Sequence, residues 1–104
     1  MRQLLPLFVC ILFFCNTMNT QAQTAYKTVE GYTACVSKKY INDMIAYSNQ
    51  KDYDAIQVLL DAGVCLVIAE GITVYLMDSS WGLVEIRPKG MTDTVWTVRE
   101  AIKQ

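Results

Sequence analysis

Three β-rich runs decide the fold of this chain: ITVYLMD at residues 72–78, LVEIR at residues 83–87 and TVWT at residues 94–97. Turn residues separate them, with Ser-Ser-Trp-Gly over 79–82 and Pro-Lys-Gly over 88–90. Short runs of β-branched and aromatic residues at this spacing are typical of antiparallel hairpins. The whole stretch therefore predicts a small antiparallel meander or barrel.

Two further elements flank these runs. A short apolar run over residues 64–69 predicts one more strand ahead of them. Behind them, Thr97 and Glu100 have the spacing of a capping box, which predicts one helical turn through Ile102.

The segment ahead of the strands predicts two helices. Ser37 is placed to cap an amphipathic helix that ends near Gln50, and Asp52 is placed to cap a second helix through Ala62. The connection is short, so residues 35–63 are expected to form an antiparallel helical hairpin. The lead-in over residues 26–33 has no clear period, and we expect it to be loosely ordered until Cys35 ties it down.

The first residues have the pattern of a secretory signal peptide. Arg2 is followed by an apolar run over residues 4–15, which is shorter than the roughly 20 residues that a bilayer span needs. Cleavage after Ala22 predicts a signal peptide at 1–22 and a single mature domain at 23–104. A lipoprotein and an uncleaved anchor are the alternatives for this segment.

The charge of the mature chain argues against polyanionic partners. The chain has nine Lys and Arg residues, of which Arg2 leaves with the signal peptide, so eight face ten Asp and Glu residues and the net charge is −2. Nucleic acids and anionic membranes are bound by concentrated basic surfaces. We therefore expect no nucleic-acid partner and no stable membrane insertion after cleavage.

Two cysteines remain after removal of the signal peptide, and they predict a disulfide. Cys10 and Cys15 leave with it, whereas Cys35 and Cys65 stay. A pair of thiols in an exported protein favours a disulfide, and the expected helical hairpin would bring these two together. The alternative is a pair of buried free thiols. A metal site is not expected, because the chain has no His.

The second half of the mature chain resembles a bacterial SH3-like barrel. The resemblance is carried by the order of a short apolar strand, a Gly turn, a long strand, a Gly-containing hairpin, the VEIR strand and a Trp-containing strand followed by a helical turn. It implies an SH3-like antiparallel β-barrel at 64–102. Together with the predicted helices and cysteine pair, this gives an α+β protein in which the helical hairpin at 35–63 is joined to the barrel by a disulfide. It also implies a binding fold, although bacterial SH3 domains commonly lack the hairpin and the disulfide.

The sequence offers little for catalysis. There is no His to act as a base beside a nucleophile, and the four Ser residues are accounted for by caps and turns. Asp78 and Glu85 are the pair that a small carboxylate-dependent hydrolase would use, provided that they face each other in a groove. No cofactor is expected, and the protein is not expected to be an enzyme.

Aromatic residues are the remaining candidates for a site. Trp96 lies within a predicted strand and is expected in the core, whereas Trp81 lies in a hairpin turn. Trp81, Tyr75 and Arg87 are the predicted binding residues, as a shallow patch for stacking on a sugar or packing against a peptide. The alternative is that Trp81 folds over the sheet and closes one end of the barrel.

These observations favour an exported, non-catalytic binding module for a peptide, protein or cell-wall partner, acting in the periplasm or outside the cell. An inhibitor or immunity-type protein that blocks an envelope or secreted enzyme is the alternative. The carboxylate-dependent envelope hydrolase carries less weight. The ligand and the oligomeric state are left open.

Overall fold

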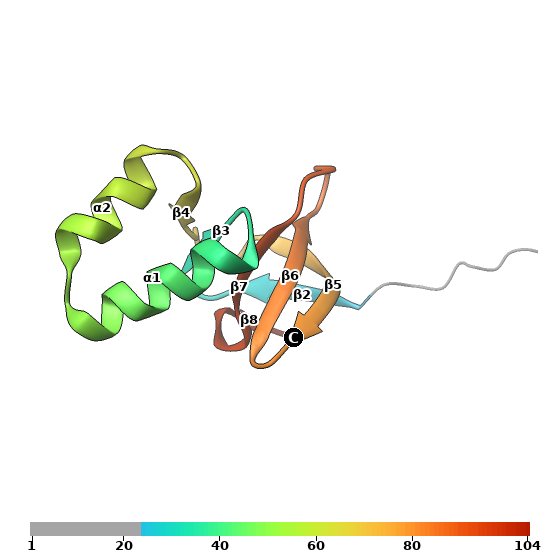
Figure 1. Cartoon of the computed structure of the whole chain (residues 1–104). Helices are drawn as coiled ribbons and strands as arrows, with labels where there is room; N and C mark the ends of the chain where they lie inside the picture. Colours follow the sequence, from blue (N-terminus) through green and yellow to red (C-terminus); the bar gives the residue numbers. More distant parts are fainter. Residues whose placement is uncertain (1–23) are drawn as a thin grey trace, which may run out of the picture.

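The structure is a computed structural model that describes residues 24–104, and it is α+β (Figure 1). The elements in chain order are β2 (Ala25–Thr28), β3 (Thr33–Cys35), α1 (Lys38–Gln50), α2 (Tyr53–Asp61), β4 (Cys65–Val67), β5 (Thr73–Ser80), β6 (Leu83–Pro88), β7 (Val95–Val98), the 3₁₀ turn η3 (Arg99–Ala101) and β8 (Ile102–Lys103). The predicted signal peptide, with Cys10 and Cys15, lies outside the described residues.

All seven strands belong to one antiparallel sheet with the order β4-β3-β7-β6-β5-β2-β8. The predicted meander of β5, β6 and β7 forms its centre. The expectation that the lead-in is loosely ordered is wrong, because β2 pairs with β5 and β8 while β3 pairs with β4 and β7. These strands satisfy backbone groups that β5 and β7 would otherwise leave without partners.

Both helices begin at the predicted caps. The Ser37 hydroxyl accepts a hydrogen bond from the Tyr40 backbone N–H at 3.3 Å, and the Asp52 carboxylate accepts one from the Ala55 N–H at 3.2 Å. On the exposed face of α1, Lys39 lies 2.8 Å from the Asp43 carboxylate. The hydrogen bond and the charge of Asp43 raise the pKa of Lys39. Because these capping residues are a local signal in the sequence, they predict where each helix begins.

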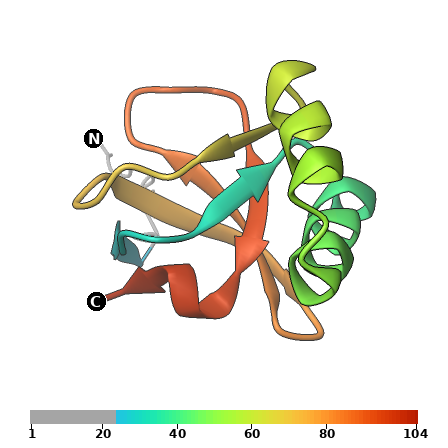
Figure 2. The same ribbon diagram turned by 90° about the vertical axis from the view of Figure 1, so that its left-hand side faces the viewer.

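The sheet has a core on each of its two faces. The helices α1 and α2 cover one face, where the buried cluster is Cys35, Ile41, Met44, Leu59, Cys65, Leu83 and Trp96. The sheet curls so that its other face is concave (Figure 2). The second buried cluster, on that face, is Val74, Val84, Ile86 and Ile102. Ala34 and Ile68 near one end of the sheet pack with Ala101 near the other end. The curl therefore brings the two ends of the sheet towards each other.

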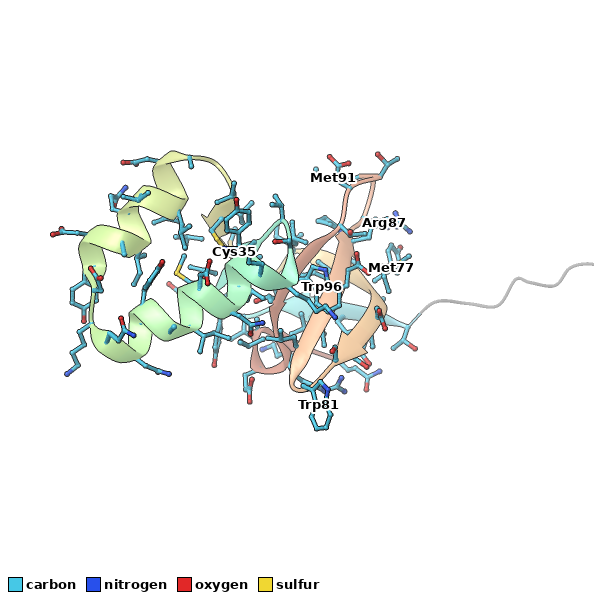
Figure 3. All side chains as sticks on the ribbon, viewed as in Figure 1. Cys35, Met77, Trp81, Arg87, Met91 and Trp96 are labelled. Atoms are coloured by element: carbon cyan, nitrogen blue, oxygen red, sulfur yellow. A yellow bond between two sulfur atoms is a disulfide. The ribbon has the colours of Figure 1, made fainter. Side chains whose placement is uncertain are left out.

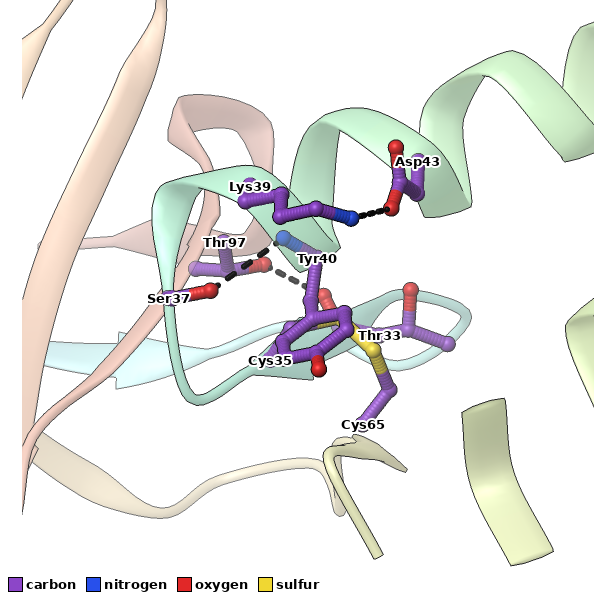
Figure 4. The surroundings of a disulfide bond; sticks show 8 residues. All are labelled: Thr33, Cys35, Ser37, Lys39, Tyr40, Asp43, Cys65 and Thr97. Carbon is purple, nitrogen blue, oxygen red and sulfur yellow. Dashed lines mark hydrogen bonds and ion pairs between the residues drawn. A yellow bond between two sulfur atoms is a disulfide. The ribbon is translucent and has the colours of Figure 1, made fainter. Parts of the chain in front are cut away.

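The disulfide between Cys35 and Cys65 is confirmed (Figure 4). The two residues lie opposite each other on β3 and β4, their Cα atoms are 4.0 Å apart, and both side chains are buried in the core beneath the helices. The chain between them contains both helices. The bond thus closes the base of the helical segment and fixes β4 to β3.

The capping box predicted after the last strand is wrong. Thr97 lies inside β7, fully buried, and its hydroxyl donates to the Thr33 carbonyl at 2.7 Å. The turn that follows is the short η3, and no side chain caps its start at Val98. The hydroxyl that was expected to cap a helix instead joins β7 to β3.

Candidate binding site

A cavity of about 320 Å³ opens on the inner face of the curled sheet. Its floor consists of apolar side chains from four central strands: Ala34, Val74, Ile86 and Val95. One rim comes from β4 and the segment after it, through Leu66, Val67, Ile68, Ala69 and Ile72. The other rim comes from the end of β6 and the loop that follows, through Pro88, Met91 and Asp93. We call this cavity and its two rims the β4 groove.

The rims of the β4 groove expose apolar side chains to solvent. Leu66, Val67, Ile72 and Met91 are all large hydrophobic residues with more than two-fifths of their surface exposed, and all four line the groove. Contiguous exposed apolar surface of this kind marks interaction sites in soluble proteins. The groove is therefore the strongest binding candidate among the described residues.

The strand β4 leaves a backbone edge beside this groove. It is the first strand of the sheet and pairs only with β3 within residues 24–104. The Ile68 N–H donates to the Tyr32 carbonyl, and the Val36 N–H donates to the Val64 carbonyl. Because hydrogen-bonded and non-hydrogen-bonded pairs alternate along an antiparallel ladder, the N–H and C=O groups of Cys65 and Val67 point away from β3. They are available to a further strand.

Thr28 fixes the chain that forms the first rim. Its hydroxyl donates to the Ala69 carbonyl at 2.6 Å and accepts from the Ile72 N–H at 2.8 Å. Its backbone N–H donates to the Ile72 carbonyl at 3.0 Å, and its carbonyl accepts from the Gly71 N–H at 2.9 Å. Thr28 is buried, so these four bonds hold the turn that leaves β4.

The second rim is fixed from β6. Arg87 donates from Nη1 to the Met91 carbonyl at 2.9 Å, and the Thr94 hydroxyl donates to the Glu85 carboxylate at 2.7 Å. These bonds hold the loop 89–94 near each of its ends. Met91 and Asp93 are therefore presented to the groove by an anchored loop.

Two of the three predicted binding residues lie together, and the third does not. Tyr75 and Arg87 face each other across β5 and β6, with the guanidinium carbon 5.0 Å from the centre of the Tyr75 ring. Trp81 follows Tyr75 by six residues and lies just past the end of β5, roughly 20 Å away at the usual rise of a strand. Figure 3 shows Arg87 and Met91 at one end of the sheet and Trp81 at the opposite end. The three residues do not form one patch.

Trp81 projects from the tip of the β5–β6 hairpin and is 100% exposed. The alternative that it folds over the sheet and closes the barrel is therefore wrong. Trp81 and Gly82 have φ values of 51° and 80°, and a type I′ hairpin turn requires positive φ at both central positions. Asn-Gly is the usual choice there, and a left-handed conformation costs a bulky residue roughly 1–2 kcal/mol. The turn holds an aromatic side chain in solvent at an energetic cost.

Trp96 is a core residue, as predicted. It is 9% exposed and packs in the cluster beneath the helices. The Lys38 ammonium lies 5.3 Å from the centre of its ring. This cation–π contact joins the first turn of α1 to the sheet.

Asp78 and Glu85, the pair named for the hydrolase hypothesis, are cross-strand partners on β5 and β6. Each already takes part in a local hydrogen bond: Asp78 accepts from the Ser79 N–H at 2.8 Å, and Glu85 accepts from Thr94. Neither residue lines the β4 groove or the second cavity, of about 260 Å³, between α1 and residues 31–33. Asp78 bonds to its own strand, and Glu85 helps to hold the loop after β6.

The sequence did not single out the residues that build the groove. Thr28 lies in a lead-in without a clear period, and Met91 and Asp93 lie between the expected turn at 88–90 and the β-rich run at 94–97. One signal was available: the run at 64–69 is apolar at every position, without the polar alternation of a half-buried strand. A strand of this kind needs cover on both faces, and this one is at the edge of the sheet.

Comparison of the chain with protein-family models, with curated proteins and with solved structures gives no match. Among the described residues, neither helix is long and apolar enough to cross a membrane. Residues 24–104 also contain no group of three or more His, Cys, Asp and Glu side chains that is arranged to hold a metal ion. The groove geometry is thus the basis for a functional proposal.

Proposed function

We propose that this chain is an exported, non-catalytic binding module that takes an extended peptide segment of a partner protein into the β4 groove. The observation that carries the proposal is the exposed, apolar edge of β4 at the rim of an apolar cavity. The partner segment adds as a strand to β4 and places side chains in the cavity. Backbone bonds supply affinity in this mode of recognition, and pockets for alternate side chains supply specificity.

The edge of β4 supports strand addition because it lacks the residues that normally protect an edge strand. Natural proteins protect edge strands with charges, proline or bulges, because an open edge invites pairing with other chains. The sequence from Cys65 to Ala69 is Cys-Leu-Val-Ile-Ala, without a charge or a proline. A partner strand that covers this edge would explain why the edge carries none of the usual protecting residues.

The cavity supports the same mode by its size and chemistry. Ligand pockets commonly measure about 300–1,000 Å³ and are lined mainly by apolar side chains. The β4 groove, at about 320 Å³, lies at the small end of this range, and Thr28 and Asp93 are its non-apolar lining residues. It suits one or two aliphatic side chains of a short segment.

The curled seven-stranded sheet also supports the proposal that the fold is an SH3-like barrel, and the disulfide supports export. A disulfide and the lack of a membrane-spanning helix among the described residues are compatible with a periplasmic or extracellular protein. In this proposal the two helices are a disulfide-closed addition to a binding barrel.

An NMR titration tests the proposed function. The probe is the acetylated, amidated hexapeptide Thr-Val-Thr-Val-Thr-Gln, added to the ¹⁵N-labelled oxidised protein. We expect chemical-shift changes at the amides of residues 65–69 and at Met91. Val67→Lys should abolish them, because it places a charge on the strand edge.

The chain offers a matched control for this variant. Val58 on α2 has the same exposure as Val67, 64% for each, and lies away from the groove. Val58→Lys should bind the peptide like the wild type. Shift changes that are absent, that lie outside the groove, or that survive Val67→Lys would contradict the proposal.

A second candidate function is contact with a cell-wall glycan through Trp81. The full exposure of this side chain and its unfavourable left-handed conformation support it, since aromatic faces stack on sugars. The test is co-sedimentation with isolated peptidoglycan sacculi, in which the wild type should pellet and Trp81→Asn should stay in solution. If the wild type stays in solution, this candidate fails while the β4 groove is unaffected.

A further inference from the structure

The one acidic side chain at the β4 groove is Asp93, and it has no partner within the described part of the chain. Its residue is exposed on the anchored loop after β6. No hydrogen bond and no ion pair among residues 24–104 engages its carboxylate. The groove thus combines an apolar floor with a single negative charge at one rim.

The two cations at this loop leave the Asp93 carboxylate without an ion pair among the described residues: Lys89 lies beyond ion-pair distance from it, and Arg87 is engaged elsewhere. Arg87 donates to the Met91 carbonyl and places its guanidinium over the Tyr75 ring. It acts as a positioning residue that holds the loop, and it does so from the outer face of the sheet, where Tyr75 and Arg87 are paired. The negative charge of Asp93 is therefore left for a ligand.

We propose that the segment bound in the β4 groove carries a basic residue, Lys or Arg, beside its apolar side chains, and that Asp93 is the group that selects it. This inference rests on the proposed function and names the chemistry of its ligand. The apolar side chains fill the cavity, while the basic side chain reaches the Asp93 rim with its aliphatic stem along Met91. Met91 suits this role because its unbranched side chain adapts to different neighbours.

The charge contributes selectivity more than total affinity. A solvent-exposed ion pair contributes modestly, and complementary charge mainly discriminates between ligands. We expect a basic peptide to bind at least about threefold more tightly than its neutral counterpart, and an acidic one to bind more weakly. The difference should shrink as salt is added, because the pair lies at the surface.

The experiment compares the neutral hexapeptide with versions that carry Lys or Glu at either end, measured by NMR titration or calorimetry on the oxidised protein at low and high salt. Both ends are tested because an added strand can pair with β4 in a parallel or an antiparallel direction. Asp93→Lys should reverse the preference from Lys to Glu. Asp78→Lys is the control, because Asp78 is an exposed carboxylate that does not line the groove.

The outcomes separate this inference from the function on which it rests. If all the peptides bind at the groove with equal affinity, or if Asp93→Lys leaves the preference unchanged, the inference is overturned and the peptide-binding function stands. If no peptide binds, both fall. A reversal by Asp93→Lys but not by Asp78→Lys supports both.

Discussion

The two edges of the sheet are formed by β4 and β8, and they differ in length, charge and surroundings. The strand β8 has two residues, one of which is Lys103, so it presents a short and charged edge. The strand β4 has three apolar residues beside a cavity, and a disulfide holds it in place. Edge strands are normally protected in the way that β8 is. This contrast is the basis of the proposal that a partner strand covers the β4 edge.

The largest expected effect concerns what holds β4. Replacing both Cys35 and Cys65 by Ala should lower the free energy of unfolding by about 3–4 kcal/mol, the chain-entropy value for a loop of this size. The loop spans 30 residues. The midpoint of thermal unfolding should fall by more than about 10 °C, measured by circular dichroism. Reduction of the wild type should match the variant, and an unchanged midpoint in both would show that the ladder with β3 alone secures β4.

Thr28 connects the two edges and provides the second prediction. It pairs with Ile102 of β8 through its backbone, while its hydroxyl holds the turn after β4. Thr28→Val should cost about 1–3 kcal/mol, because the Ala69 carbonyl and the Ile72 N–H lose a buried partner. Hydrogen exchange should rise at residues 69–72 more than at β8.

The control for Thr28 is Thr73→Val. The Thr73 hydroxyl accepts a hydrogen bond from Lys27 at an exposed position, so its loss should change stability little. Equal losses in urea unfolding for the two variants would mean that the Thr28 hydroxyl has no special part in shaping the groove.

Trp81 lies away from both edges. It is therefore a comparison for the exposed apolar residues of β4, because it is exposed and apolar but does not line the groove. Trp81→Asn should raise the free energy of unfolding by about 1 kcal/mol, because Asn tolerates the left-handed conformation of the turn. Trp81→Asn should not affect binding at the β4 groove. A destabilised variant, measured by urea unfolding, would indicate that the Trp81 side chain contributes contacts to the fold.

The smallest effect on stability is expected when the charge pattern of the edges is exchanged. Val67→Lys and Lys103→Val should each change the free energy of unfolding by less than about 0.5 kcal/mol, as exposed substitutions usually do. Their effects on the fluorescence of a bound apolar dye should differ. Val67→Lys should reduce dye binding, and Lys103→Val should leave it unchanged, because Val67 lines the β4 groove and Lys103 lines neither described cavity. A rise in dye fluorescence with Lys103→Val would show that charge alone distinguishes the two edges.

The parts of the fold that the sequence predicted are those that local signals encode. Ser37 and Asp52 cap helices by hydrogen bonds to residues three positions away, and the β5–β6 hairpin is set by Trp81 and Gly82 between two alternating runs. The disulfide followed from the number of cysteines. Each of these features depends on a few neighbouring residues, so a pattern in the chain is enough to find it.

The parts that were missed depend on distant residues. The short strand β2 is held by pairing with β5 on one side and β8 on the other. The strand β8 in turn pairs only with β2 among the described strands. The residues that line the β4 groove come from six strands and two connecting segments, so no single stretch of sequence predicts the groove. Tyr75 and Arg87, two members of the predicted patch, are cross-strand neighbours in the structure. Trp81 lies apart from them because the β5–β6 ladder continues to the Ser80–Leu83 pair, which carries the turn away from Tyr75 and Arg87.

The position of the disulfide has a consequence for cleavage by proteases. Cys35 and Cys65 flank the two helices. The exposed Lys51 lies between α1 and α2 and has a left-handed backbone conformation. A trypsin-like enzyme that cut after Lys51 would divide the polypeptide into two pieces, each carrying strands of the same sheet. The two pieces would stay covalently linked, with β3 still bonded to β4. In an environment rich in proteases, the connection between the helices can be cut while the strands that form the β4 groove remain on a single molecule.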